Sequence, residues 1–363
     1  MNETPKKIRL CLQTSIAPNK TEIDTTKLRA VFTKDKLWPA YKNITVGFIG
    51  DGENTILQED FPINEDPLNI QIMNLLRSNP RMITIKDAIK RIVKERIEPI
   101  VNLKFIFIEN PLEALVKISF KNDGSDSDLG YDGDNLSREM NYGWFNVHVV
   151  LHEFGHLIGL YHEHQSPIEN PISWDKEAIY KIVGEQTNWT VQDIEHNIIN
   201  MLNKESINGS TFDPLSIMQY PYPPEFTTNK IGSKLNGRFS GKDVLWICKT
   251  YPKQNEDPRV TAENFYQRVY GESLQSDIDK SEKLAAELRV PTFSPVPSFS
   301  PVPPVPLVPP VPSFSPVPTF SPVPTVPTVP TVPSKLQSKT IWIVIGIVFG
   351  LFIIWGVIAL IIK

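Results

Sequence analysis

The longest uninterrupted apolar stretch of the chain covers residues 341–362, which hold no charged side chain. As an α-helix this stretch would be about 33 Å long, close to the roughly 30 Å of a bilayer's hydrocarbon core. We therefore predict a single transmembrane helix over 341–362. Within it Gly346 and Gly350 form a GxxxG pair. This pair predicts a weak homodimer, although glycine is also common in membrane helices that do not associate.

Alternating and helical apolar patterns mark the elements of a globular part. Ile85, Ala88 and Ile89 begin an apolar face at helical spacing behind Thr84 and Asp87, which have the spacing of a capping box. A second capping box, Ser240 and Asp243, predicts a helix to about residue 250. Branched and aromatic runs predict strands at 44–49, 103–108 and 115–120, and polar, glycine-rich 123–133 predicts a loop. This order favours an α/β (α+β) domain with a mixed sheet.

Prolines are concentrated in one segment ahead of the apolar run. Residues 291–333 hold 17 of the 33 prolines, within four copies of [ST]-F-S-P-V-P and three T-V-P triplets. Proline fixes φ and lacks an N–H, so polyproline II is expected. We interpret 291–334 as a semi-rigid stalk, and a ligand for SH3 or WW domains is the alternative.

These segments define a domain order. Residues 1–36 form an N-terminal extension that is a candidate pro-segment, 37–252 the globular domain, and 253–290 a charged, partly helical connector. The first twenty residues contain no apolar stretch of signal-peptide length. With an anchor at 341–362 we expect a single-pass, tail-anchored membrane protein whose globular domain lies on the cytosolic side of the bilayer.

Charge and cysteine content exclude several classes of protein. The chain has 37 basic and 41 acidic residues, and this balance argues against a nucleic-acid partner. Its two cysteines, Cys11 and Cys248, are too few for a disulfide-stapled scaffold or a cysteine-built zinc finger.

Candidate chemistry is concentrated in a cluster of histidines. Five of the six histidines fall between His148 and His164. On a helix, His152 and His156 project from one face and can share a metal ion. Gly159 permits the chain to leave the helix and to return His162 towards the same ion. Three imidazoles leave one position open for water, as in catalytic zinc sites, so we predict one Zn²⁺ per chain. Glu153, beside the first ligand, is the expected base for that water.

The run H-E-F-G-H-L-I-G-L-Y-H-E-H (152–164) resembles the zinc motif of metzincin metalloendopeptidases. Glu163 after the third histidine makes it similar to the astacin branch. The segment S-I-M-Q-Y (216–220) resembles the astacin methionine turn. The resemblance implies a metzincin-like domain with a twisted mixed sheet and an active-site helix, with Met218 beneath the zinc and Tyr220 as a catalytic phenol. Astacins usually carry four disulfide-forming cysteines, which this chain cannot supply.

We expect the remaining three histidines not to be metal ligands. We interpret His148 as a flanking helix residue, although it could be imagined as a ligand, His164 as a rim or second-layer residue, and His196 as a surface residue.

The sequence thus predicts a membrane-anchored zinc-dependent metalloendopeptidase that acts on protein or peptide substrates. By analogy with the fold of the family that the motif resembles, an upper-rim strand near 115–128 would hold the substrate extended by strand addition. Three alternatives stay open: a zinc-binding module without activity, an adaptor that works through its proline repeats, and a different metallohydrolase.

Overall fold

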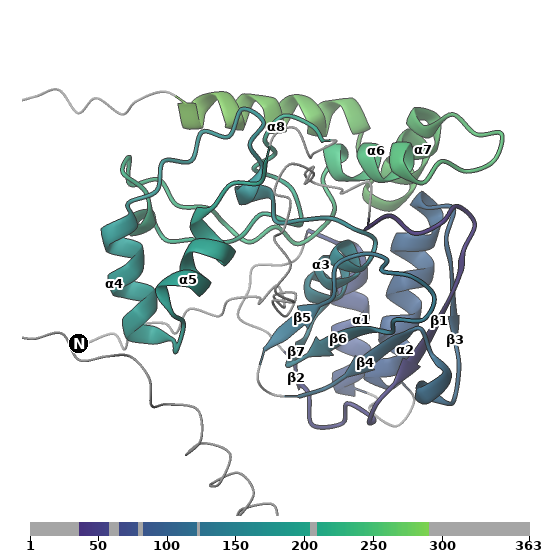
Figure 1. Cartoon of the computed structure of the whole chain (residues 1–363). Coiled ribbons are helices and arrows are strands. Elements are labelled where there is room, and N and C mark those ends of the chain that lie inside the picture. The colour runs from purple at the N-terminus through teal and green to yellow at the C-terminus, as the bar shows by residue number, and fades with distance from the viewer. Residues whose placement is uncertain (1–35, 58–64, 79–82, 122–123, 204–208, 290–363) are drawn as a thin grey trace, which may run out of the picture. The chain divides into compact units, whose positions relative to one another are not determined.

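The computed structural model describes residues 36–57, 65–78, 83–121, 124–203 and 209–289 (Figure 1). The predicted stalk (291–334), the predicted membrane helix (341–362) and almost all of the N-terminal extension lie outside these ranges. Among the helices that the structure does describe, none has both the length and the apolarity needed to cross a bilayer.

A five-stranded mixed sheet forms one layer of the domain. Its spatial order is β3-β1-β4-β6-β5, with parallel pairing throughout except for β5, which runs antiparallel to β6. The strands are β1 (Asn43–Phe48), β3 (Lys104–Phe107), β4 (Val116–Ser119), β5 (Ser125–Ser127) and β6 (Arg138–Tyr142). A separate parallel pair consists of β2 (Ile56–Leu57) and β7 (Trp144–Phe145). The mixed α/β character and the three predicted strands are confirmed.

One sequence-based expectation about this sheet is wrong. The polar segment 123–133 contains β5, although its composition predicts a loop. Ser125 pairs with Tyr142 and Ser127 with Met140, so this strand exists because β6 supplies its hydrogen-bonding partners. Strand β5 is an edge of the sheet, whereas β4 is paired on both sides.

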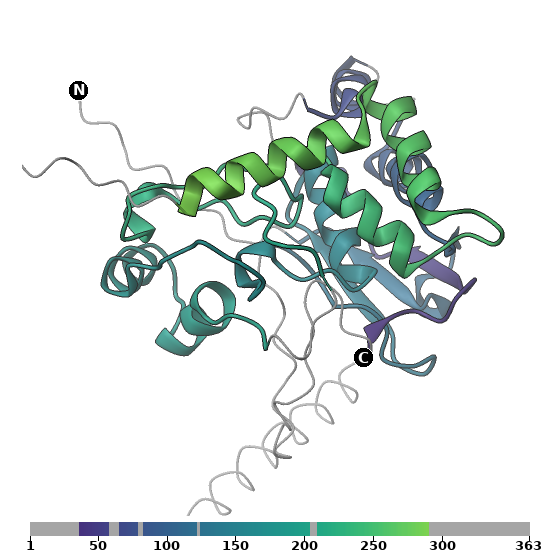
Figure 2. The same cartoon turned by 90° about the horizontal axis from the view of Figure 1, so that it is seen from above.

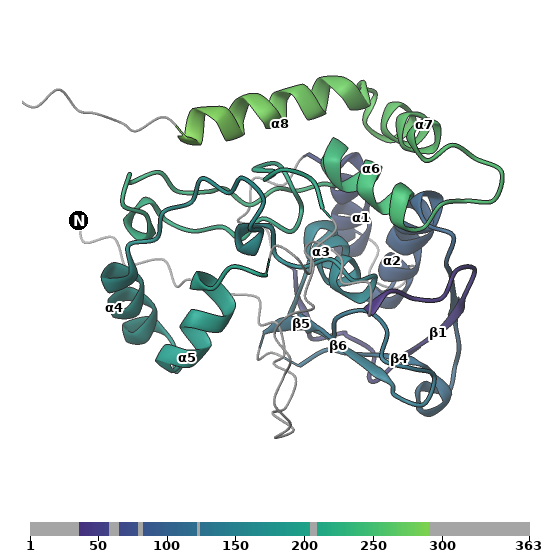
Figure 3. The same cartoon turned by 45° about the horizontal axis from the view of Figure 1, so that its top comes forward.

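Three helices cover one face of the sheet (Figures 1 and 3). The predicted capping box is present at α2, where the Thr84 side chain accepts a hydrogen bond from the Asp87 N–H and Asp87 accepts one from the Thr84 N–H. Helix α2 continues into a π-helical turn and a 3₁₀ turn before β3 begins. The elements are α1 (Pro67–Ser78), α2 (Ile85–Ile92), the turns Val93–Ile97 and Glu98–Ile100, and α3 (Val147–Leu157).

A second apolar cluster lies around α4 and α5. Its buried residues include Ile179 and Val183 of α4, Ile194 of α5, and Phe212 and Phe226 from the loops that follow. The elements here are α4 (Lys176–Gln186), α5 (Val191–Ile194), the π-helical turn Glu195–Ile199, and the 3₁₀ turns Glu163–Gln165 and Pro224–Phe226. A further 3₁₀ turn, Pro111–Glu113, contacts β1.

The C-terminal part of the described chain consists of three helices packed on one another: α6 (Gly241–Thr250), α7 (Pro258–Tyr270) and α8 (Leu274–Arg289) (Figure 2). Phe265, Tyr266 and Leu274 are buried in the main core, and Ala285 is buried in the second cluster. The segment expected as a charged connector therefore packs on the globular part through an apolar face.

Candidate metal centre

Helix α3 presents the first two histidines of the motif. The Asn146 side chain caps its start by accepting a hydrogen bond from the Val149 N–H. All of α3 is buried. His152 and His156 lie one turn apart on one face, and their ring centroids are 4.8 Å apart.

The chain then reverses within a few residues. Gly159 has φ +102°, a conformation that favours glycine, and its N–H donates to the carbonyl of His156. The reversal returns His162 to α3, where its Nε2 lies 3.3 Å from Nε2 of His152 and 3.2 Å from Nε2 of His156. The chain therefore leaves the helix at Gly159 and returns His162 to it, as predicted from the sequence.

The hydrogen bonds of these rings fit a metal ion. Nδ1 of His152 donates to the Ile217 carbonyl at 2.9 Å, and Nδ1 of His156 donates to the Leu160 carbonyl at 2.8 Å. A proton on each of these two Nδ1 atoms leaves the Nε2 lone pairs of His152 and His156 free, and both lone pairs are available to a metal ion beside Nε2 of His162. A tetrahedral zinc ion with Zn–N bonds of about 2.0–2.1 Å would need N···N separations of about 3.3–3.4 Å. The observed separations agree with that requirement.

Burial sets the charge of this group. It lowers the pKa of His152 to about 4, and it lowers the pKa values of His156 and His162 well below the usual value for histidine. Neutral imidazole is the form that binds metal ions. In the described part of the chain, these three residues form the group of histidines, cysteines and carboxylates that could hold a metal ion.

The segment expected as a methionine turn lies directly beneath α3. A Cβ atom placed on Gly155 would lie 2.6 Å from Sδ of the fully buried Met218, so this glycine permits the close approach. The Met218 carbonyl accepts a hydrogen bond from the Glu163 N–H at 3.0 Å. The turn therefore contacts both α3 and the segment that follows His162.

The two predicted catalytic side chains are also near the triad. Glu153 is fully buried on α3, next to His152. The ring of Tyr220 lies 5.2 Å from that of His162, measured between centroids, and the residue is 3% exposed.

Burial, and secondarily the charge of Glu153, raises the pKa of Tyr142 at the end of β6. Tyr142 could not be identified from the sequence, because no local pattern places β6 beside α3.

The three other histidines stay out of the triad. His148 is buried and donates from Nδ1 to the Asn236 carbonyl at 2.6 Å, which fits a flanking residue. His164 is completely buried, so it is not at a rim, and its ring packs against Tyr220 while Nε2 donates to a backbone carbonyl. His196 is exposed, as expected.

The residues that hold the methionine turn were not predicted from the sequence. Asp243 was identified only as part of a capping box, which is present at α6. The same carboxylate accepts hydrogen bonds from the Ser216 hydroxyl and the Ile217 N–H, both at 2.8 Å. The side chain of Asn236 donates to the carbonyls of Pro214 and Ser216. The S-x-x-D pattern predicts the helix cap, but it does not predict that Asp243 also holds the methionine turn.

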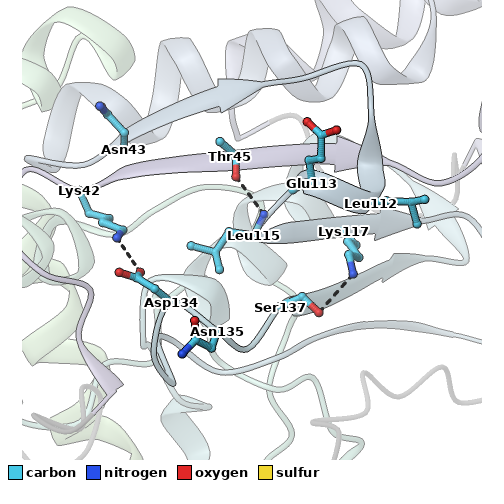
Figure 4. A pocket seen from close by; sticks show the side chains of 11 residues that line it. Lys42, Asn43, Thr45, Leu112, Glu113, Leu115, Lys117, Asp134, Asn135 and Ser137 are labelled. Carbon is cyan, nitrogen blue, oxygen red and sulfur yellow. Dashed lines mark hydrogen bonds and ion pairs between the residues drawn. The ribbon is translucent and has the colours of Figure 1, made fainter.

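A polar surface pocket of about 460 Å³ lies elsewhere, between the start of β1 and the segments 112–117 and 134–137 (Figure 4). Lys42 pairs there with Asp134, and Lys117 donates to Ser137. None of the histidines of the triad lines this pocket, so it is separate from the metal centre.

Comparison with known proteins agrees with this geometry. Residues 84–235 match the model of the peptidase family described as Astacin. A relative named zinc metalloproteinase nas-8, from Steinernema carpocapsae, is 28% identical over 145 residues, which cover 36% of this chain and 32% of that protein. The chain thus spans about a third of the length of this relative. The resemblance to astacins read from the motif is confirmed.

Two solved structures are similar to the described domain. Myroilysin is 25% identical with a TM-score of 0.45, covering 61% of this chain and 98% of that one. High choriolytic enzyme 1, a hatching enzyme zinc-protease from the medaka fish Oryzias latipes, is 14% identical with a TM-score of 0.33, covering 60% and 96%.

Proposed function

We propose that this astacin-like chain is a zinc-dependent metalloendopeptidase that hydrolyses internal peptide bonds. The observation that carries the proposal is that Nε2 of His162 lies 3.3 Å from Nε2 of His152 and 3.2 Å from Nε2 of His156. Glu153 lies on the same helix as His152 and His156. His152, His156 and His162 would hold the ion. Zinc bound there supplies Lewis acidity, which polarises a carbonyl group and lowers the pKa of water to about 7.

The protein's own side chains would carry the proton transfers. Glu153 would accept the proton of the attacking water and deliver it to the leaving amine. Tyr220 would donate a hydrogen bond from its phenol to the oxyanion that develops on the scissile carbonyl. The position of the Tyr220 ring beside His162 supports this assignment.

The substrate would be held in an extended conformation along the sheet. Within the segment 115–128 expected to do this, β5 is the edge strand, and it packs on α3. Peptides add to a sheet at an edge strand, and β5 has a neighbouring strand of this sheet on one side only, whereas β4 has one on both sides. We therefore assign strand addition to β5.

The full chain would work at a membrane surface. This part of the proposal rests on the sequence of 341–362 and on the stalk at 291–334, both outside the described residues. The globular domain would lie on the cytosolic side of the bilayer, and the stalk could bind an SH3- or WW-type partner. Gly346 and Gly350 would form the contact of a weak homodimer. Protease protection of the full chain in sealed vesicles tests the topology, since a domain on the inner side would survive added protease.

Peptide cleavage tests the catalytic assignment. Purified full-length protein in detergent, loaded with zinc, is incubated with a mixed peptide library, and the products are identified by mass spectrometry. Glu153→Gln preserves the size of the side chain and should lower kcat by about 10²–10⁴-fold, because general base catalysis contributes that much. Its zinc content should stay at that of the unaltered protein.

Two outcomes would contradict the proposal. Equal cleavage by Glu153→Gln would remove Glu153 from the mechanism. Zinc binding by the unaltered chain without cleavage of any peptide would favour a zinc-binding module without activity. Removal of zinc with a chelator should abolish cleavage, and added zinc should restore it.

A further inference from the structure

We propose that helix α8 positions the metal centre from a distance, with Ser281 as the positioning residue. This inference rests on the metal site of the proposed function and deepens it. Helix α8 lies beyond residues 84–235, the part of the chain that matches the family model. Ser281 reaches the ligand-bearing segments through Asp213, in three steps of buried hydrogen bonds.

The first step joins α8 to the loop that leads into the methionine turn. The Ser281 hydroxyl donates to Oδ1 of Asp213 at 2.6 Å, and the Ser240 hydroxyl donates to Oδ2 at 2.6 Å. Ser281 is 0% exposed and Asp213 is 1% exposed. A buried carboxylate depends on such donors, because each one replaces a hydrogen bond to water that folding removes.

The second step joins this loop to the third ligand. The Asp213 N–H donates to Oε1 of Glu163 at 2.8 Å, and Glu163 follows His162 directly in the chain. The Glu163 N–H in turn donates to the Met218 carbonyl. The loop from Asp213 to Met218 is thus attached at both ends to the residue after His162.

The third step reaches the first ligand through α6. Asp243 accepts hydrogen bonds from the Ser216 hydroxyl and the Ile217 N–H. The Ile217 carbonyl accepts the Nδ1 proton of His152, and this bond fixes which ring nitrogen faces the metal. Ser240, the cap of α6, also holds Asp213, so the two carboxylates share one support.

Helix α8 is itself held close to this network. Oδ2 of Asp277 accepts a hydrogen bond from the Gly241 N–H at 2.7 Å, and Arg238 donates to Oδ1 of Asp277 and to Glu272. A Cβ atom on Gly241 would lie 3.0 Å from the Leu274 carbonyl oxygen. The glycine therefore lets the start of α8 approach the backbone of α6, which sets the position of Ser281 about two turns further along the helix.

Oδ1 of Asp213 accepts two hydrogen bonds, from the Ser281 hydroxyl at 2.6 Å and from the Leu215 N–H at 3.0 Å. Loss of the Ser281 hydroxyl would remove the shorter of the two. A shift of the loop that compensates for this loss would change the hydrogen bond from the Asp213 N–H to Oε1 of Glu163, which is 2.8 Å long. Residues that orient metal ligands from outside the coordination shell typically contribute about 10–100-fold in metal affinity. Ser281 acts through one more intermediate, so we place its effect at the lower end, about 10-fold.

The test compares Ser281→Ala with Ser276→Ala in the full-length protein. Ser276 is an exposed serine on the same helix, so its replacement controls for the change in composition. The zinc dissociation constant is measured by competition with a chromophoric chelator, and the Co²⁺-substituted protein gives an absorption spectrum that reports ligand geometry. We expect about 10-fold weaker zinc binding and an altered cobalt spectrum for Ser281→Ala, and no change for Ser276→Ala.

A purely structural role would give a different result. If Ser281→Ala lowers the free energy of unfolding while its zinc affinity and cobalt spectrum match the unaltered protein, the proposal is overturned. Ser281→Thr keeps the hydroxyl and should retain zinc affinity. A threonine variant as weak as the alanine variant would show that the hydroxyl is not the acting group.

A double-mutant cycle tests the route through Asp213. If Ser281 acts on the metal through that carboxylate, adding Ser281→Ala to Asp213→Asn should weaken zinc binding little beyond Asp213→Asn alone. Independent, additive effects would overturn the route. These measurements need no substrate. A chain that binds zinc but cleaves no peptide would refute the proposed function, and the role of Ser281 in zinc binding could still be tested.

Discussion

The contact between Gly155 and Met218 allows a sharp test of how the metal centre is built. Gly155 lies between the two histidines of α3, and a Cβ atom there would lie 2.6 Å from Sδ of Met218. Real Cβ atoms do not approach sulfur so closely, so Gly155→Ala must displace the methionine side chain. Met218 is fully buried, which leaves it little room to move.

The expected magnitude combines two opposing effects. Overpacking a buried site costs about 1–3 kcal/mol. Replacing glycine with alanine inside a helix stabilises by about 0.8–1 kcal/mol. Gly155→Ala should therefore lower the free energy of unfolding by about 0–2 kcal/mol. It should also weaken zinc binding, because the Met218 carbonyl holds the Glu163 N–H next to His162.

Urea unfolding of the zinc-free protein measures the free energy of unfolding of each variant. Two further variants show whether the effect of Gly155→Ala comes from its contact with Met218. Gly184→Ala is the matched control, since Gly184 is exposed within α4 and a Cβ atom there meets nothing within 4 Å. It should stabilise by about 1 kcal/mol. In a Met218→Ala background the steric conflict is absent, so Gly155→Ala should become stabilising by a similar amount, about 1 kcal/mol.

The cycle between the two sites should therefore show a coupling of about 1–3 kcal/mol. If Gly155→Ala has the same effect with and without Met218, the methionine is not what the glycine accommodates. The packing account of the methionine turn would then be refuted.

Two further predictions concern stability. Burial lowers the pKa of His148 to about 3, so the unfolded state binds more protons below pH 6.5 and stability falls as the pH drops through that value. In the zinc-free protein, His148→Gln should remove about 1.4 kcal/mol of the loss seen between pH 7.5 and pH 5.5 in urea unfolding, and an unchanged pH profile would contradict this. Tyr251→Phe should cost about 1–3 kcal/mol in thermal or urea unfolding, because the buried phenol donates to the Ile158 carbonyl at 2.7 Å. Its zinc affinity should stay unchanged; a large loss would place Tyr251 among the positioning residues.

Much of the metal centre follows from the sequence because its geometry is local. His152 and His156 are four residues apart on a helix, which fixes their common face whatever surrounds them. Gly159 reverses the chain within a single turn, so His162 can return without help from distant segments. The capping boxes at Thr84 and Ser240 are likewise patterns of four residues, and both are present.

Other parts of the site depend on contacts that no local pattern encodes. Strand β5 has a polar, glycine-rich sequence typical of a loop, and it pairs only because β6 lies beside it. Asp243 holds the methionine turn, and Ser281 holds Asp213, across 26 and 68 residues of sequence respectively. The segment after residue 253 is rich in charge, yet its few apolar residues complete the core.

The physical reason for this division is the range of the forces involved. Helical periodicity, glycine conformation and end-capping are decided within a few residues, so the sequence by itself determined the ligand set and its spacing. Burial and the pairing of buried carboxylates with hydroxyl donors depend on which segments the whole fold brings together. Only the tertiary structure decided that α8 supports the metal centre, that His164 is buried, and that β5 forms an edge of the sheet.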